Sequence, residues 1–169
     1  MNNAIKGKRN RATGELFEKM ISSSCDWYLS ENIAKIEKQS EPMKIIKSLP
    51  LGRFVACFAK KSGVDYKGTL AGGKAVCFEA KHTDTDVMPR SRLEDWQIDY
   101  LKDHMQMGAV TFVLLSFNLE RFYRIPFEYW LNMKQIFGKI SVREKDIEKF
   151  RIPATGGKIR FLHGIGDKL

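Results

Sequence analysis

Cysteine and histidine are scarce in this chain, and neither is arranged to hold zinc. The three cysteines, Cys25, Cys57 and Cys77, are far apart and form no C-x-x-C motif. This spacing argues against a thiolate zinc site and a disulfide framework, so we expect reduced cysteines in the core. The three histidines are also isolated and lack the i, i+4 spacing of a metal-binding helix. Any metal in this protein should therefore be held by oxygen ligands.

Long apolar segments and a secretory signal are also missing. The longest largely apolar run, residues 109–115, is far shorter than the roughly 20 residues that cross a bilayer. Residues 1–11 are basic, and no apolar stretch follows them, so they predict no signal peptide. We expect a cytoplasmic protein with no membrane partner.

The charge balance is strongly basic. Lys and Arg outnumber Asp and Glu by 29 to 20, a formal net charge of +9 at pH 7. This excess favours a polyanionic partner such as nucleic acid, with simple solubility as the alternative. Residues 1–12 are too polar to bury themselves and predict a flexible basic tail ahead of one domain over residues 13–169. The cations of this tail that could contact DNA phosphates are Lys6, Lys8, Arg9 and Arg11.

Hydrophobic periodicity predicts both helices and strands. Residues 39–53 interrupt it with two prolines, several cations and no clear period, and we interpret them as a protruding excursion. Trp27, Trp96 and Tyr100 lie in helical apolar stripes, so we expect them in the core rather than on a base-stacking surface. The predicted helices are residues 13–29, 93–104 and 127–137, plus a short one opened by a capping box from Ser141 to Glu144, and the predicted strands are residues 32–38, 54–59, 109–117, 121–125 and 158–162, with a hairpin over 64–81.

The residues that point most clearly to chemistry lie in the predicted hairpin. Asp65 is followed fourteen residues later by the triplet Glu79-Ala80-Lys81. Side chains alternate along a strand, so Glu79 and Lys81 share a face, and the hairpin brings Asp65 across to them. Two adjacent carboxylates repel unless a cation lies between them, and oxygen ligands suit a hard ion such as Mg²⁺. With a lysine to orient water or stabilise phosphate charge, this is the minimum for phosphodiester hydrolysis. A cross-strand salt bridge is the alternative interpretation.

These motifs resemble those of a known family. Asp65-Tyr66-Lys67-Gly68, then Phe78-Glu79-Ala80-Lys81, then Trp96-Gln97 are similar to the motifs of the RecU-type Holliday junction resolvases, within the PD-(D/E)xK nuclease superfamily. The resemblance extends over residues 14–162. It implies a restriction-endonuclease-like α/β fold, in which helices flank a mixed central β-sheet and a stalk protrudes. It also implies a structure-specific endonuclease that makes symmetric nicks in four-way DNA junctions by metal-dependent phosphodiester hydrolysis.

The resemblance also implies roles for individual residues. Asp65 and Glu79 would bind Mg²⁺ or Mn²⁺, and Lys81 would act on the attacking water. Glu18, on the first helix, would complete the outer shell of the metal, with an ordinary solvated helix charge as the alternative. Gln97 would position substrate or water. The stalk corresponds to residues 39–53, and the cations in and beside it that would meet junction phosphates are Lys38, Lys44, Lys47 and Arg53.

A twofold junction needs two symmetric nicks, so the resemblance implies a homodimer. Branched DNA would be the substrate, and host recombination proteins would be further partners. The short chain favours a phage-encoded member of the family. Two alternatives stay open: a non-catalytic DNA-binding protein that modulates recombination on the nuclease scaffold, and a nuclease for other DNA structures.

Overall fold

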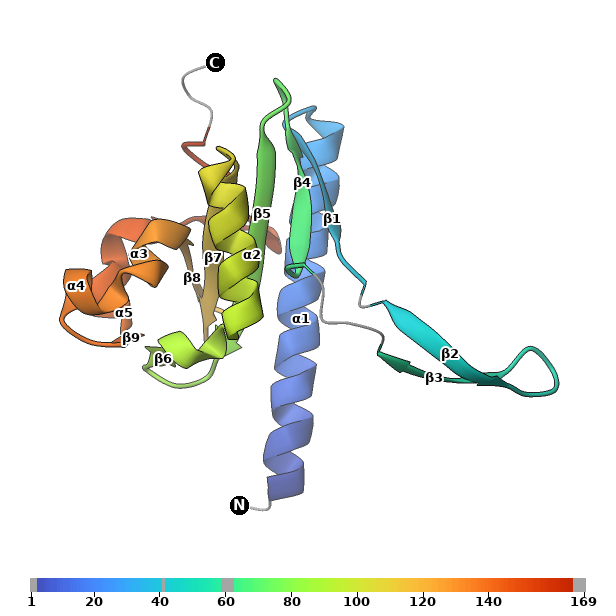
Figure 1. The fold of residues 1–169 in the computed structure, drawn as a ribbon. Coiled ribbons are helices and arrows are strands. Elements are labelled where there is room, and N and C mark those ends of the chain that lie inside the picture. Colours follow the sequence, from blue (N-terminus) through green and yellow to red (C-terminus); the bar gives the residue numbers. More distant parts are fainter. Residues whose placement is uncertain (1–2, 41, 59–62, 166–169) are drawn as a thin grey trace.

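The fold is built around a six-stranded sheet with the strand order β1-β4-β5-β7-β8-β10 (Figure 1). The computed structural model describes residues 3–40, 42–58 and 63–165, without the side chains of residues 3–10 and 58. β5 and β7 are parallel, and the other neighbouring pairs are antiparallel. The predicted mixed sheet is therefore confirmed. Its strands are β1 (Ala34–Lys38), β4 (Tyr66–Leu70), β5 (Ala75–Thr83), β7 (Val110–Phe117), β8 (Arg121–Pro126) and β10 (Arg151–Ile152).

Helices cover both faces of the sheet because its central strands are apolar on both. The long helix α1 (Asn3–Ser30) packs against β1 and β5, and α2 (Asp95–Gln106) packs against β5 and β7. In β7, Phe112 and Leu114 belong to the core cluster that includes α1, whereas Val113 and Leu115 belong to the cluster that includes α2. This alternation explains why the strand is apolar throughout, as predicted, and confirms the α/β class with flanking helices.

Two buried polar side chains of α1 hold the last part of the described chain. The backbone N–H of Ile159 donates to Ser24 Oγ at 2.7 Å, and that of Leu162 donates to Tyr28 Oη at 2.8 Å. Each bond satisfies a polar group that would otherwise be costly to bury. The remaining short elements are β6 (Met88–Pro89), η1 (Arg90–Arg92), α3 (Phe127–Leu131), α4 (Met133–Phe137), β9 (Ser141–Val142), α5 (Glu144–Ile147), η2 (Glu148–Phe150), β11 (Ala154–Thr155) and β12 (Lys158–Ile159).

A β-hairpin protrudes from the sheet between β1 and β4 (Figure 1). It consists of β2 (Met43–Ser48) and β3 (Phe54–Phe58), and all six residues of β2 are exposed. The predicted protrusion is confirmed. Its extent was underestimated, because the strand predicted at 54–59 is the second arm of the hairpin. With both faces exposed, the arms lack the buried-exposed alternation that marks a strand in the sequence.

The start of α1 differs from the prediction. The helix begins at Asn3 rather than Thr13, so residues 3–12 are its first turns and not a separate segment. These residues are polar, but they contain no proline, and a helix can continue past the core that stabilises it. Within the described residues, no helix is both long enough and apolar enough to cross a membrane.

Three smaller predictions are wrong. The predicted helix over residues 127–137 is divided at Asn132 into α3 and α4. The capping box from Ser141 to Glu144 does not form, because Ser141 lies in β9; instead the carboxylate of Asp146 accepts from the backbone N–H of Arg143 at 2.7 Å. Cys57 is exposed on the hairpin, unlike the buried Cys25 and Cys77.

Candidate active site

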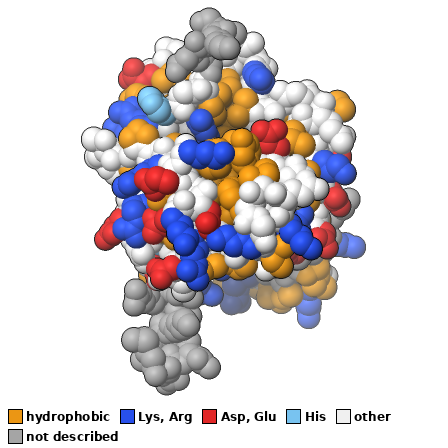
Figure 2. All heavy atoms as spheres, turned by 90° about the vertical axis from the view of Figure 1, so that its left-hand side faces the viewer, with side chains coloured by type: hydrophobic (Ala, Val, Ile, Leu, Met, Phe, Trp, Pro, Cys, Tyr) orange, Lys and Arg blue, Asp and Glu red, His pale blue; other side chains and the backbone are white. Residues whose placement is uncertain are grey.

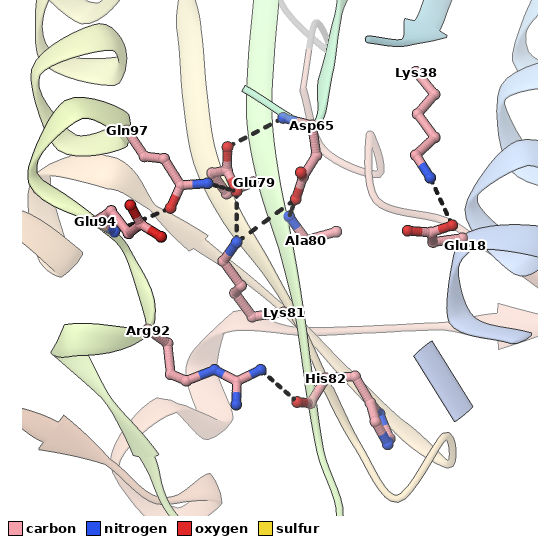
Figure 3. Close-up of polar contacts among 10 residues, drawn as sticks. All are labelled: Glu18, Lys38, Asp65, Glu79, Ala80, Lys81, His82, Arg92, Glu94 and Gln97. Carbon is pink, nitrogen blue, oxygen red and sulfur yellow. Dashed lines mark hydrogen bonds and ion pairs between the residues drawn. The ribbon is translucent and has the colours of Figure 1, made fainter. Parts of the chain in front are cut away.

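The acidic residues singled out in the sequence meet where β4 begins. The antiparallel register pairs Tyr66 of β4 with Phe78 of β5. Asp65, which directly precedes Tyr66, is therefore placed beside Glu79 and Lys81 of β5. The predicted convergence of these three side chains is present (Figure 3).

Backbone and side-chain hydrogen bonds lock the two carboxylates together. The N–H of Asp65 donates to Glu79 Oε1 at 3.1 Å, and the N–H of Ala80 donates to Asp65 Oδ2 at 3.0 Å. Lys81 Nζ lies 2.7 Å from Glu79 Oε2 and 3.8 Å from Asp65 Oδ2 (Figure 3). Each strand therefore orients the acid of its neighbour, and one ammonium group bridges both acids.

Gln97 joins this cluster from α2. Its Nε2 donates to Glu79 Oε2 at 2.6 Å, and its Oε1 accepts from the backbone N–H of Glu94 at 3.0 Å. Glu94 is the N-cap of α2, so the first turn of the helix fixes the amide of Gln97. Gln97 is buried. Its direct contact is with Glu79, which makes it a positioning residue in this structure.

The environment of Glu79 opposes its ionisation. The side chain is fully buried, and burial, together with the adjacent charge of Asp65, raises the pKa of Glu79 to about 8. Lys81 acts in the other direction and lowers this pKa, but less than burial raises it. The free protein therefore carries a carboxyl group whose negative charge is stabilised by any additional cation placed beside it.

The residues present fit a hard divalent cation. Asp65 and Glu79 supply carboxylate oxygens from adjoining strands, and the Lys81 ammonium already occupies a cation position beside both. The side chain of Asp65 is 36% exposed, so the pair can be reached from solvent. Among the residues that the structure describes, no three His, Cys, Asp or Glu side chains gather closely enough to form a metal site by themselves. Further ligands would have to come from water or substrate.

Glu18 is not brought to this pair. It extends from α1, which covers the other face of the sheet from α2, and its Oε2 lies 2.6 Å from Nζ of Lys38 (Figure 3). Both side chains are about half exposed. The structure therefore gives Lys38, at the end of β1, a place in the sheet beside α1 rather than in the hairpin.

The other predicted DNA contacts lie in two places. Lys44 and Lys47 lie on β2 and Arg53 lies just before β3, all exposed on the hairpin. Arg11 is exposed on α1. The backbone of Lys6, Lys8 and Arg9 is also within α1, but their side chains lie outside the described part of the chain.

Basic side chains on another face of the molecule are interspersed with acids. On the face that carries α3, α4 and α5, Lys and Arg side chains alternate with Asp and Glu around an apolar area (Figure 2). Lys139 pairs with Asp146 at 2.7 Å, and Arg121 donates to Glu144. The hairpin is different, because residues 43–58 contain three Lys or Arg residues and no Asp or Glu.

A pocket of about 250 Å³ opens beside the carboxylates. Asp65, Lys81 and Gln97 line it, as do Arg92, Glu94 and Trp96 from the segment that leads into α2. The prediction that Trp96 lies in the core is wrong, since this side chain is only partly buried and forms part of the pocket. Sequence reasoning missed its place because Trp96 lies at the edge of the helix face that Gln97, Ile98 and Leu101 bury. Trp27 and Tyr100 do pack against the core clusters, as predicted.

Comparison with known proteins identifies relatives of this chain. The family model described as "RecU: Recombination protein U" matches residues 12–165. Two relatives named Holliday junction resolvase RecU are similar to the chain. The protein from Streptococcus gordonii is 34% identical over 130 residues, covering 73% of this chain and 64% of the relative. The protein from Streptococcus sanguinis is 33% identical over 144 residues, covering 80% and 72%. The chain thus spans about two thirds of the length of these relatives.

The solved structure of Hjc, a Holliday junction resolvase from Archaeoglobus fulgidus, also aligns with the chain. It aligns with 81% of this chain and 88% of its own, with a TM-score of 0.46 and 12% identity. The assignment of the chain does not depend on that structure, because the family model extends over nearly the whole sequence. The chain belongs to the RecU, or Recombination protein U, family.

Proposed function

We propose that this protein is a Holliday junction resolvase: a structure-specific endonuclease that nicks four-way DNA junctions. The observation that carries the proposal is the meeting of Asp65, Glu79 and Lys81 beside a pocket that Asp65 and Lys81 line. Membership of the RecU family and relatives that carry this name support it. The substrate class agrees with the net charge of +9.

Hydrolysis of a phosphodiester forms a bond between a water oxygen and phosphorus and breaks one P–O ester bond. The water loses a proton, and the departing oxygen gains one. Asp65 and Glu79 would hold a Mg²⁺ or Mn²⁺ ion, which when bound would supply Lewis-acid stabilisation of the negative charge and a more acidic water. Asp65 is the solvent-exposed carboxylate of this pair, and Glu79 is the buried one.

Lys81 contributes a positive charge where the attack takes place. Its side chain is only 15% exposed and is held by Glu79, so its ammonium group is oriented before substrate arrives. From this position it donates a hydrogen bond to the attacking water or to the phosphate oxygen that gains charge. Gln97 keeps the carboxylate of Glu79 in place through its 2.6 Å hydrogen bond.

The hairpin supplies the means of recognising a branched substrate. Its exposed cations, Lys44, Lys47 and Arg53, contact backbone phosphates, and its protrusion from the sheet lets it enter the opening of a four-way junction. The active form is a homodimer, because a junction with twofold symmetry needs a second active site to receive a second nick.

The decisive test is a nicking assay on synthetic four-way DNA with 5′-labelled strands. In Mg²⁺ we expect symmetric nicks in two opposing strands, and in EDTA we expect binding without nicks. A linear duplex of the same sequence is the matched substrate control. Equal cleavage of duplex and junction would contradict the resolvase assignment while preserving the nuclease. An absence of nicks with intact junction binding would favour the non-catalytic alternative.

A further inference from the structure

The pocket contains side chains that the chemistry above does not use. Arg92, Glu94 and Trp96 line it together with Asp65 and Lys81. An aromatic ring and a guanidinium group therefore lie in the same small space as the proposed catalytic residues. Such a combination is typical of surfaces that bind unpaired nucleotides.

The ring of Trp96 is held in place although it does not belong to the core. The buried side chains of α2 are Gln97, Ile98 and Leu101, whereas Trp96 is only partly buried. Its Nε1 donates to Glu94 Oε2 at 2.7 Å, a hydrogen bond to a charged acceptor that limits rotation of the indole. Glu94 also donates its backbone N–H to Gln97. One helical turn thus orients both the ring and the amide that contacts Glu79.

Arg92 adds positive charge on the strand side of the same pocket. Its side chain is exposed, and one guanidinium nitrogen lies 3.4 Å from the carbonyl oxygen of His82 (Figure 3). His82 directly follows Lys81 in β5. The guanidinium of Arg92 and the ammonium of Lys81 therefore belong to neighbouring parts of the pocket lining. Arginine at such a position contacts phosphate oxygens in a planar, paired geometry.

The size of the pocket limits what can enter it. Its volume is about 250 Å³, which suits a single nucleotide unit rather than a stacked duplex. A base in a continuous duplex also has both faces covered by its neighbours, so it has no free face to offer an indole.

We propose that Trp96 stacks against one unpaired base next to the scissile phosphate, and that Arg92 contacts the neighbouring phosphate. The inference rests on the proposed function and extends it by assigning a nucleobase subsite to the pocket. The occupant is a nucleotide splayed out of its stack near the branch point. Because every base has an aromatic face, the subsite recognises an unstacked strand rather than a sequence. It therefore favours branched over linear DNA close to the site of cleavage.

The test uses two variants that differ in aromaticity: Trp96→Phe keeps a ring, and Trp96→Leu keeps an apolar side chain without one. A four-way junction carries 2-aminopurine at the nucleotides that flank the mapped nick, and binding is measured in EDTA so that the strands stay intact. We expect quenched 2-aminopurine emission in complexes of the unmodified protein and Trp96→Phe, and unquenched emission with Trp96→Leu. Junction affinity of Trp96→Leu should fall at least about fivefold, with linear-duplex affinity unchanged.

Controls separate this subsite from general effects. Trp27→Leu alters a tryptophan that packs against Tyr28 and Arg160, and it should leave the 2-aminopurine signal unchanged. Arg92→Ala should weaken junction binding and reduce the slope of log affinity against log salt by about 1. Equal quenching and equal affinity for Trp96→Leu and the unmodified protein would overturn the inference, even if the protein nicks junctions normally. A protein that nicks no DNA, yet loses quenching only in Trp96→Leu, would overturn the proposed function and support the subsite.

Discussion

The central sheet and the β2–β3 hairpin are both built from hydrogen-bonded strand pairs, but they differ in what covers them. In β5, residues 76–79 are buried, and this strand holds Glu79 within hydrogen-bond distance of three donors. In β2, every residue is exposed, and Met43, Ile45 and Phe54 of the hairpin are each more than half exposed. The sheet fixes a few atoms in place, whereas the hairpin leaves its side chains exposed to solvent.

The hairpin also has two unlike faces. Residues directly opposite each other in an antiparallel pair share a face. Lys44 therefore shares a face with Cys57, and Lys47 shares it with Val55, whereas Ile45 and Ala56 lie on the other face. One face is basic and the other is apolar. We therefore expect changes in the sheet to affect chemistry or folding and changes in the hairpin to affect binding.

The largest effect should come from the site itself. Lys81→Ala removes the ammonium group beside both carboxylates, so we expect single-turnover nicking to fall by about 10²–10³-fold. Junction binding should stay within about twofold of the unmodified protein, because one phosphate contact contributes little to total affinity. The control is Lys67→Ala, which removes an exposed lysine from the neighbouring strand β4. Nicking by Lys81→Ala at the rate of the Lys67→Ala control would show that the ammonium is not part of the machinery.

The sheet and the hairpin each contain a glycine, and the two glycines have different surroundings. A Cβ at Gly68, in β4, would lie 2.0 Å from the carbonyl oxygen of Lys35 and 2.6 Å from the Cα of Ile36. Gly68→Ala must therefore separate β1 from β4, and we expect a loss of about 3 kcal/mol in the free energy of unfolding. Gly52, at the tip of the hairpin, has a φ of +71° and nothing within 4 Å of its Cβ position. Gly52→Ala should cost only about 1 kcal/mol, from backbone strain.

Urea denaturation of both glycine variants measures this difference. The comparison fails if Gly52→Ala destabilises the protein as much as Gly68→Ala, because the hairpin would then be part of the cooperative core.

A smaller effect is expected on the basic face of the hairpin. The double variant Lys44→Ala and Lys47→Ala should weaken junction binding about tenfold and lower the slope of log affinity against log salt by about 2. Nicking at saturating protein should be unchanged, since these residues lie outside the pocket. Binding measured by fluorescence anisotropy from 50 to 300 mM salt, as a practical range, provides the readout. An unchanged salt slope would place the phosphates elsewhere on the protein.

A further effect concerns pH. In the metal-free protein the pKa of Glu79 is raised from 4.5 to about 8. An acid whose folded-state pKa is raised stabilises the fold below its unfolded pKa, and this contribution is lost as pH rises through the folded pKa. The urea midpoint should therefore fall between pH 4.5 and pH 8 in EDTA, and Glu79→Gln should reduce that fall. Glu37→Gln, on an exposed position of β1, is the control. A pH dependence identical in both variants would contradict the assigned environment of Glu79.

Some contacts of the site could be predicted from the sequence and others could not, for physical reasons. The sequence predicts the proximity of Asp65, Glu79 and Lys81, because strand periodicity and hairpin pairing depend on residues close together in the chain. The contact between Gln97 and Glu79 depends on how α2 docks on the sheet, so a local pattern does not contain it; resemblance to a family pointed to Gln97. Whether Glu18 reaches the site depends on which sheet face α1 covers, and this is also a property of the tertiary structure.

The same reasoning explains the two main errors. Trp96 fits an apolar helical stripe, but it lies at the edge of the buried face of α2, and its ring lines the pocket. The second arm of the hairpin is apolar, but it pairs with β2 outside the sheet, where no core selects an alternating pattern. In both cases an apolar pattern in the sequence predicted burial for residues that lie at the edge of the core or outside it.

The most direct measurement is single-turnover nicking of a four-way junction by Asp65→Asn in Mg²⁺, with junction binding followed in the same samples. Asp99→Asn, on an exposed position of α2, is the matched control. Loss of nicking in Asp65→Asn, with binding retained and with full activity in Asp99→Asn, is the predicted result. Nicking by Asp65→Asn at the rate of the unmodified protein would contradict the assignment of this pocket as the site of hydrolysis.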